Sequence, residues 1–248
     1  MKAVHFILQG KGGVGKSFIA TLLAQYLSQH NEIVGFDTDP VNASFEQYKS
    51  LSVQTVPILT DSDTIDTSRF DSLIELILED NQQVAVVDNG AATFVPLMSY
   101  MYETQAISML VSMGVKVFFH VPLVGGKAKP DTIKGLNDVL ARWGEEAQVV
   151  VWLNNFQGLF EEEVSFKDTA LYAQHQSSIA GVINIAKRNE DTFGKDIREM
   201  TEQNLTFDEV LTSSKFSIMP KHRLKMVRDG VFNQLDEISW GEEHESVE

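Results

Sequence analysis

Short apolar runs, rich in β-branched residues, alternate with helix-like stretches along most of the chain. The runs cover residues 3–8, 33–36, 53–58, 84–87, 115–121, 149–153 and 179–185. Several are apolar at every position, which is typical of strands covered by helices on both faces. The pattern predicts an α/β fold: a doubly wound, mostly parallel sheet with helices on both faces. Ligands of such sheets bind at the carboxyl ends of the strands.

The pattern also predicts one domain over residues 1–235, because no internal repeat and no Pro- or Ser-rich linker interrupts them. Residues 236–248 differ in composition. They carry Asp236, Glu237, Glu242, Glu243, Glu245 and Glu248 and no Lys or Arg. We expect this segment to be an acidic, solvated and disordered tail.

A glycine-rich segment, GKGGVGKS at residues 10–17, separates the first apolar run from a helical pattern over residues 18–27. It matches G-x-x-x-x-G-K-[ST] in the strand–loop–helix context that a phosphate-binding loop (P-loop) requires. Glycines let the backbone wrap around phosphate oxygens, and the helix N-terminus favours the anion. The sequence therefore predicts a P-loop NTPase. Its nucleotide contacts are expected from Gly10, Lys11, Gly12, Gly13, Val14, Gly15, Lys16, Ser17 and Phe18.

Two side chains of the loop have specific expected roles. Lys16 is expected to reach the β- and γ-phosphates, and the Ser17 hydroxyl is expected to bind Mg²⁺. Asp88 ends the apolar run at residues 84–87 and brings a carboxylate to the same edge of the sheet, as the Walker B aspartate of a P-loop protein does. An aspartate at a strand end is also common in turns.

Composition and charge limit the other classes of function. The chain has 248 residues, no cysteine and a formal net charge of −15. The missing cysteines exclude disulfides, thiolate zinc sites and iron–sulfur clusters. The charge argues against a surface that coats nucleic acid or anionic lipid as a whole. No apolar run approaches the length of about 18 residues that a membrane span needs, so we expect a cytoplasmic protein without membrane contact.

A second lysine, Lys11, opens the loop. The segment KGGVGKS at residues 11–17 resembles the deviant Walker A ATPases of the ParA/MinD group. The resemblance implies that Lys11 reaches the nucleotide of a second subunit. DTDP at residues 37–40 is similar to the D-x-D-P motif of that group. By this resemblance Asp39 orients the attacking water, and Asp37 and Asp88 act on Mg²⁺ through bound water.

The resemblance extends toward the C-terminus. The run at residues 149–153 leads into Asn154, where the family presents an asparagine to adenine; Asn155 takes this place if the register differs by one. The guanine-specific N-K-x-D motif is absent there, which favours ATP over GTP. Further blocks at residues 94–97, 205–209 and 217–219 are similar to ParA-like proteins of conjugative plasmids. Two positions depart from the family: Phe18 replaces a second hydroxyl residue, and Val41 replaces a glutamine.

The resemblance implies Mg²⁺-dependent hydrolysis of ATP to ADP and phosphate, with catalytic roles for Lys11, Lys16 and Asp39. It further implies a homodimer that forms on ATP binding, and a protein partner in plasmid conjugation or partition. Such a protein acts as a switch, because the γ-phosphate orders loops that hydrolysis releases.

Two alternatives stay open. The first is a P-loop kinase for a small molecule, which would need an acceptor pocket near the γ-phosphate. The second is an ATP-dependent binding module with little turnover, which would contact DNA nonspecifically through Lys221, Arg223, Lys225 and Arg228. These four residues also fit a helix with a solvated cationic face, whose buried side is then Met219, Leu224, Val227, Val231 and Phe232.

Overall fold

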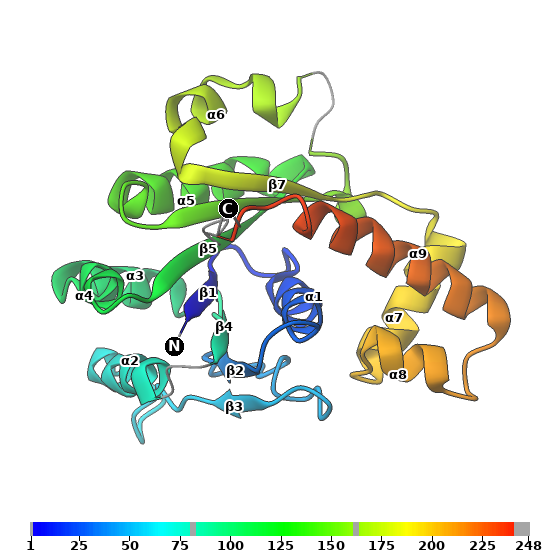
Figure 1. Cartoon of the computed structure of the whole chain (residues 1–248), viewed down its shortest axis with the longest axis horizontal. Helices are drawn as coiled ribbons and strands as arrows, with labels where there is room; N and C mark the ends of the chain where they lie inside the picture. Colours follow the sequence, from blue (N-terminus) through cyan, green and yellow to red (C-terminus); the bar gives the residue numbers. More distant parts are fainter. Residues whose placement is uncertain (1, 80–82, 161–163, 241–248) are drawn as a thin grey trace, which may run out of the picture.

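The computed structural model describes residues 2–79, 83–160 and 164–240. Over these residues, seven strands form one parallel sheet in the order β3-β2-β4-β1-β5-β6-β7 (Figure 1). The strands are β1 (Ala3–Ile7), β2 (Ile33–Asp37), β3 (Val53–Thr55), β4 (Val84–Asp88), β5 (Lys116–Val124), β6 (Gln148–Asn154) and β7 (Ile179–Ile185). The chain leaves β1 toward β2 on one side and later adds β5 on the other. The end of β1 is therefore the point where the strand order reverses, and it is the expected place for a ligand.

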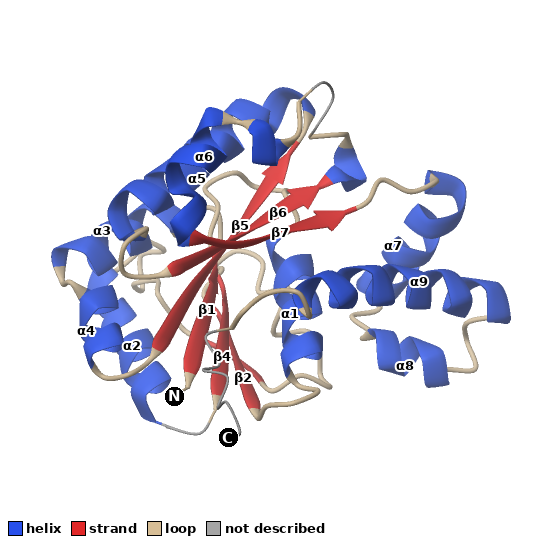
Figure 2. Ribbon diagram, turned by 45° about the horizontal axis from the view of Figure 1, so that its top comes forward, coloured by secondary structure: helices blue, strands red, loops and turns tan. Residues whose placement is uncertain are grey.

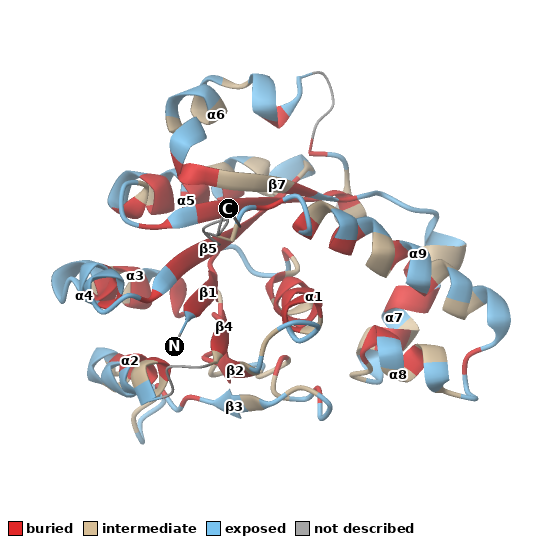
Figure 3. Cartoon of the chain, viewed as in Figure 1, coloured by how far each residue is buried: buried red, intermediate tan, exposed pale blue. Residues whose placement is uncertain are grey.

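Side chains alternate between the two faces of the sheet along each strand, so the core forms two layers. In β1, Val4 and Phe6 face one cluster of buried side chains, whereas Ala3 and Ile7 face the other. Because both faces of the sheet are apolar, each has to be covered by helices. Figure 3 shows the buried residues concentrated on the strands and on the helix faces that meet them.

Helices cover both faces of the sheet, as the sequence predicts (Figure 2). One face packs against α2 (Phe70–Glu79), α3 (Phe94–Glu103), α4 (Ala106–Ser112), α5 (Lys129–Trp143) and α6 (Ala170–His175). The other packs against α1 (Lys16–Leu27), α7 (Lys195–Glu202), α8 (Phe207–Thr212) and α9 (Ile218–Leu235). Short connecting turns are η1 (Thr67–Arg69), η2 (Gly126–Ala128), η3 (Asn155–Gln157), η4 (Phe166–Asp168), η5 (Gln176–Ser178) and the π-helical η6 (Glu190–Gly194).

All seven predicted strands are present, and β3 is the one that is much shorter than predicted. It was expected over residues 53–58 but ends at Thr55. Pro57 follows and has no N–H to donate to a ladder. Val56 and Ile58 are nevertheless buried, and the Val56 N–H donates to the Asp37 carbonyl at 2.9 Å. The apolar pattern therefore identified core residues correctly and overestimated the length of the strand.

The C-terminal segment differs from the expected tail over its first residues. After α9, Ile238 is buried and the Tyr26 hydroxyl donates to the Asp236 carboxylate at 3.0 Å. The Trp240 ring lies 5.4 Å from the His5 ring and 5.3 Å from the Phe118 ring, measured between centroids. Apolar residues between the acidic ones thus bind residues 236–240 to the sheet. Residues 241–248 of the expected tail lie outside the described residues.

Two buried histidines form a polar chain beneath this segment. The Trp152 Nε1–H donates to His120 Nδ1 at 3.0 Å. Nε2 of His120 therefore carries the hydrogen, and it lies 3.0 Å from His5 Nδ1. Burial lowers the pKa of His5 to about 3, and burial together with His5 lowers the pKa of His120 well below its usual value. Both rings are therefore neutral in the folded protein at neutral pH.

This pair makes folding sensitive to acid. Below pH 6.5 these histidines bind protons in the unfolded chain but stay neutral in the folded protein, so the free energy of unfolding decreases as the pH falls. For His5 the loss is about 2 kcal/mol between pH 7.5 and pH 5. His5→Phe removes that loss. The unfolding free energy of the wild type minus that of His5→Phe, measured in urea, should decrease by this amount as the pH is lowered from 7.5 to 5.

The comparison cancels carboxylates that titrate in both proteins. His30→Phe, at an exposed histidine, is the matched control for a histidine-to-phenylalanine change outside the buried pair. A His5→Phe difference that does not change between pH 7.5 and pH 5 would contradict the neutral buried pair.

Candidate functional site

The loop between β1 and α1 has the conformation that an anion-binding loop needs. Gly13 and Gly15 have φ values of 73° and 92°, in the left-handed region that side chains rarely adopt. Gly15 is the residue before α1, and no side chain caps this helix N-terminus. Its first N–H groups therefore face the open end of the loop, where the helix dipole also favours an anion.

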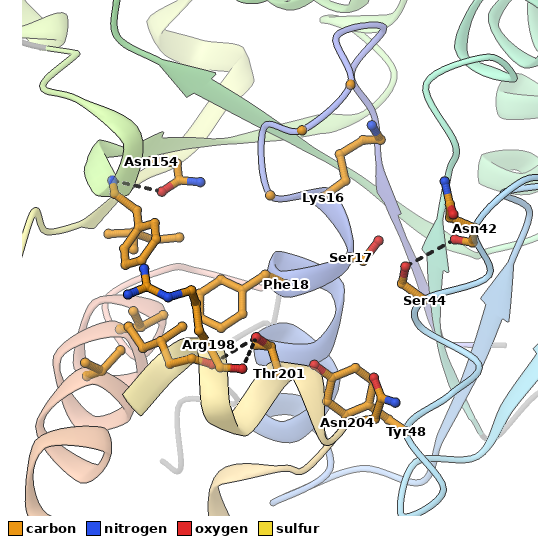
Figure 4. Close-up of a pocket in the computed structure, with 18 of the residues that line it drawn as sticks. Lys16, Ser17, Phe18, Asn42, Ser44, Tyr48, Asn154, Arg198, Thr201 and Asn204 are labelled. Atoms are coloured by element: carbon orange, nitrogen blue, oxygen red, sulfur yellow. Dashed lines mark hydrogen bonds between the residues drawn. The ribbon is translucent and has the colours of Figure 1, made fainter. Parts of the chain in front are cut away.

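A cavity of about 950 Å³ opens at this loop. It extends from Gly12, Lys16 and Ser17 past Phe18 to residues on α7 and α9. Figure 4 shows Lys16, Ser17 and Phe18 on successive positions of α1, with Asn154 on one side and Asn42 and Ser44 on the other. The structure thus brings the P-loop, the segment after β2 and the end of β6 to one cavity.

Lys16 is a buried cation. Only 8% of the residue is exposed, and its Nζ lies 3.4 Å from the Lys11 carbonyl oxygen. Burial lowers the pKa of Lys16, and the charges of Asp88 and Asp39 oppose this shift. A buried ammonium needs a compensating charge, and a bound phosphate would provide it.

Asp88 is a buried carboxylate. Among the described residues, neither of its oxygens has a hydrogen-bond partner, and the residue is 1% exposed. Burial raises the pKa of Asp88 to about 7; nearby Ser17 and Lys16 hold it down, and Asp37 and Asp39 raise it. Mg²⁺ binds carboxylate and hydroxyl oxygens together with phosphate. The Asp88 oxygens beside the Ser17 hydroxyl fit such an ion.

Asp37 has a structural role in the described chain. Its Oδ1 accepts from the Asp39 N–H at 3.0 Å, and its Oδ2 accepts from the Phe45 and Glu46 N–H groups at 2.9 and 3.1 Å. Burial raises the pKa of Asp37, and these backbone hydrogen bonds oppose the shift. The carboxylate thus fixes the loop after β2, and its action on Mg²⁺ through water stays a prediction.

Asp39 lines the cavity from that loop. Its Oδ1 accepts from the Val41 and Asn42 N–H groups at 3.0 and 3.1 Å, which sets the orientation of the carboxylate. Its other side rests against Gly90. A Cβ atom added at Gly90 would lie 2.8 Å from the Asp39 Cγ atom and 3.0 Å from its Cα atom.

Lys11 lies at the rim of the loop. Its side chain is 44% exposed, and Nζ forms an ion pair of 2.9 Å with Asp131 on α5. Pairs this exposed contribute about 0–1 kcal/mol. Breaking the ion pair between Lys11 and Asp131 therefore costs little free energy.

Asn154 is buried at the end of β6, and its amide holds the P-loop. Nδ2 donates to the Val14 carbonyl at 2.9 Å, and Oδ1 accepts from the Phe156 N–H at 3.2 Å. The Asn155 side chain bonds to the following loop and to β7 instead: its Oδ1 accepts from the Phe160 N–H, and its Nδ2 donates to Asn184 Oδ1. Contact of Asn154 with a base stays a prediction.

Sequence reasoning missed Gln9. This buried residue donates from Nε2 to the Pro122 and Thr132 carbonyls at 3.0 and 3.1 Å, and its Oε1 accepts from the Gly10 N–H at 3.0 Å. It thus attaches the start of the P-loop to β5 and α5. The sequence did carry one signal for this role: Gln9 is a polar residue directly after the apolar run at residues 3–8.

The basic stretch on α9 is partly neutralised. Arg223 Nε pairs with Asp196 at 2.5 Å, and Arg228 pairs with Asp208 at 3.0 Å and with Asp229 at 2.9 Å. Lys221 and Lys225 have no such pair in the described part of the chain. Leu224, Val227, Val231 and Phe232 are buried as predicted. Met219 was wrongly placed on that side: it is 53% exposed, because it lies in the first turn of α9, before the helix packs on the core.

Comparison with known proteins identifies the class. Residues 5–224 match the family model of the CobQ/CobB/MinD/ParA nucleotide binding domain, and the chain belongs to this family. It is 41% identical over 238 residues to Protein TraL of Escherichia coli, covering 95% of this chain and 98% of that protein. This match confirms the narrower resemblance that the later sequence blocks indicated.

Solved structures support the same fold. The MinC:MinD cell division protein complex of Aquifex aeolicus contains a chain that matches with a TM-score of 0.54 at 15% identity, over 96% of this chain and 97% of that one. A putative plasmid partition protein from Borrelia burgdorferi B31, bound to AMPPNP, matches with a TM-score of 0.52 at 14% identity, over 96% of this chain and 99% of that one. Within the described residues, none of the helices combines the length and apolar character needed to cross a membrane.

The contact between Gly90 and Asp39 gives a test of the site. Gly90→Ala must displace the Asp39 carboxylate, because the new Cβ would approach its Cγ and the backbone Cα atom too closely. Any ATP hydrolysis at this site should fall at least tenfold, since such displacements commonly cost that much or more. Nucleotide affinity should stay within about threefold, because the P-loop is unchanged. Phosphate release and isothermal titration calorimetry measure the two quantities.

Ser112→Ala, at an exposed residue outside the residues that line the cavity, is the control. It should leave the wild-type rate unchanged. Equal hydrolysis by Gly90→Ala and wild type would show that the position of Asp39 does not matter for turnover.

Proposed function

We propose that the chain is a Mg²⁺-dependent ATPase that converts ATP to ADP and phosphate and acts as a nucleotide-controlled dimer switch. The observation that supports this most is the buried pair of opposite charges at the P-loop. Among the described residues, Lys16 is buried with one 3.4 Å hydrogen bond, and the two buried oxygens of Asp88 have no hydrogen-bond partner. Both groups match what a nucleotide and its metal ion require.

In this proposal the residues mainly position charges. The P-loop amides and Lys16 bind the phosphates, and Asp39 orients the attacking water. Ser17 and Asp88 hold Mg²⁺, which supplies charge neutralisation on the phosphate oxygens. Asp37 acts indirectly, by holding the loop that carries Asp39.

The dimer would form across the face that presents Lys11. The apolar side chains of Val41 and Val95 are 75% and 66% exposed on the segments that follow β2 and β4. Both segments lead away from the cavity edge formed by Asp39 and Ala91. Lys11 would exchange Asp131 for the phosphates of the partner subunit. Hydrolysis would then require two subunits.

The cellular role that we propose is in plasmid conjugation or partition, with a protein partner that recognises the ATP-bound dimer. The similarity to Protein TraL and to a putative plasmid partition protein supports this role. Contact of DNA with α9 would depend on Lys221 and Lys225, since Arg223 and Arg228 are paired with carboxylates. A small-molecule kinase is the competing proposal, and release of ADP and phosphate in water without an acceptor separates the two.

The exposed lysine provides the sharpest test of this proposal. Lys11→Ala should bind ATP with nearly wild-type affinity, because Lys16 and the loop amides are intact. Hydrolysis should fall by at least a hundredfold, since a charge supplied to the transition state in trans contributes about 10³–10⁵. The mass of the Lys11→Ala protein in MgATP should be that of a monomer.

Asp131→Asn is the matched control, because it removes the partner of Lys11 within the chain and leaves the lysine. This variant should dimerise at least as well as the wild type. Turnover by Lys11→Ala equal to that of the wild type would exclude the role in trans.

A further inference from the structure

Helix α4 lies at the surface and carries no charged residue. Its sequence is AISMLVS. One side packs into the core through Ala106, Ile107 and Leu110. The exposed side consists of Ser108, Met109, Val111 and Ser112. Surface helices normally turn charged or polar residues toward water, so the outer side of α4 is unusually apolar.

Exposed apolar side chains continue at both ends of this helix. Met113 follows it, and its N–H donates to the Met109 carbonyl at 3.1 Å, which places the two methionines one helical turn apart on the same side. Tyr102 is exposed near the end of α3. We call Tyr102, Met109, Val111 and Met113 the α4 patch. Figure 3 shows exposed residues on the outer side of α4, and clustered apolar groups of this kind mark interaction sites.

Carboxylates border the patch on the α3 and α5 sides. Glu103 is exposed directly after Tyr102. In the turn after α5, Glu146 accepts a hydrogen bond from the Ser108 hydroxyl, and Glu145 is exposed beside it. The hydrogen bond to Ser108 holds this acidic turn against α4.

Further carboxylates border it on the α2 side. Asp71 accepts a hydrogen bond of 2.6 Å from the Tyr100 hydroxyl of α3. Glu75 lies one turn farther along α2, and burial, Asp71 and Glu75 all raise the pKa of Tyr100. We call these carboxylates the acidic rim: Asp71, Glu75, Glu103, Glu145 and Glu146.

Two cations near the patch do not balance this charge. The Arg142 guanidinium lies 5.4 Å from the centre of the Tyr102 ring, and its Nη1 donates to the Met98 carbonyl at 3.2 Å. Lys116 begins β5, shortly after Met113. The surroundings of the patch are therefore negative.

This charge selects the kind of partner. Nucleic acid and anionic lipid would meet carboxylates of like charge. A second copy of the chain would bring its own acidic rim against this one, which is also repulsive. A protein helix with apolar residues on one face and Lys or Arg beside them complements both the patch and the rim. Flexible methionine side chains can adapt to such a face.

We propose that the α4 patch is a docking site for a cationic amphipathic helix of another protein. The apolar face of that helix covers Tyr102, Met109 and Met113, and its Lys and Arg side chains lie against the acidic rim. The inference goes beyond the proposed ATPase and does not depend on its nucleotide site.

Methyl NMR of the full-length protein with labelled methionines tests this inference. The probe is a synthetic peptide with leucines on one helical face and lysines at the flanking positions. Titration without nucleotide should shift the signals of Met109 and Met113. Met219 and Met226 on α9 are the matched controls, because they are similarly exposed but lie at the opposite end of the molecule (Figures 1 and 2). Their signals should not move.

Affinity for the same peptide separates the apolar contribution from the charge. Met109→Ser with Met113→Ser should weaken binding at least about tenfold, because two apolar contacts are lost. The control, Met219→Ser with Met226→Ser, should bind as the wild type does.

The acidic rim is tested in the same way. Glu103→Lys with Glu145→Lys should also weaken binding at least about tenfold, since like charges then meet. The control is Asp61→Lys with Glu202→Lys, which changes the net charge by the same amount at exposed residues elsewhere. It should lower the affinity by less than about twofold.

Several results would overturn the inference. Equal weakening by the two charge-reversal pairs would mean that the peptide responds only to the net charge of −15. Equal shifts of all four methionines, or none, would show that the patch is not the site. Shifts of Met109 and Met113 on raising the protein concentration without peptide would assign the patch to a second copy. Each of these results leaves the ATPase proposal standing, because no nucleotide is present.

Discussion

The buried opposition of Lys16 and Asp88 is the constraint on which the rest of the site depends. Within the described part of the chain neither charge is fully satisfied, and burial shifts the pKa values of both groups toward their neutral forms. Burying the Lys16 ammonium at the start of α1 and the Asp88 carboxylate at the end of β4 is unfavourable unless a bound ligand compensates these charges. The fold tolerates these two buried charges because the two apolar layers of the core hold β1, β4 and α1 in place. β1 and β4 are adjacent strands, and Ile7 of β1 lies opposite Asp88.

Polar side chains outside the loop hold it in the binding conformation. Gln9 attaches its start to β5 and α5, and Asn154 attaches its Val14 carbonyl to β6. Asp37 does the same for the segment that carries Asp39. Side chains that a motif search assigns to ligand contact thus also fix the loop geometry. Such support from surrounding residues is what pre-organised binding sites require.

The sequence predicted the sheet and the P-loop because both have strong local signals. Continuous apolar runs located the strands, and GKGGVGKS located the loop. Contacts between distant residues had no such signal. Lys11 pairs with Asp131 and Arg223 with Asp196, and each partner comes from a different helix. The packing of Trp240 on His5 likewise depends on where α9 ends, so acidic composition alone gave the wrong boundary for the tail.

The most direct test of the central claim is the mass of the protein in each nucleotide state. Asp39→Ala is the suitable form for light scattering, because it should bind ATP without hydrolysing it. The account predicts a dimer with MgATP and a monomer with MgADP. The same mass in both states would contradict a nucleotide-controlled dimer, even if both nucleotides bind.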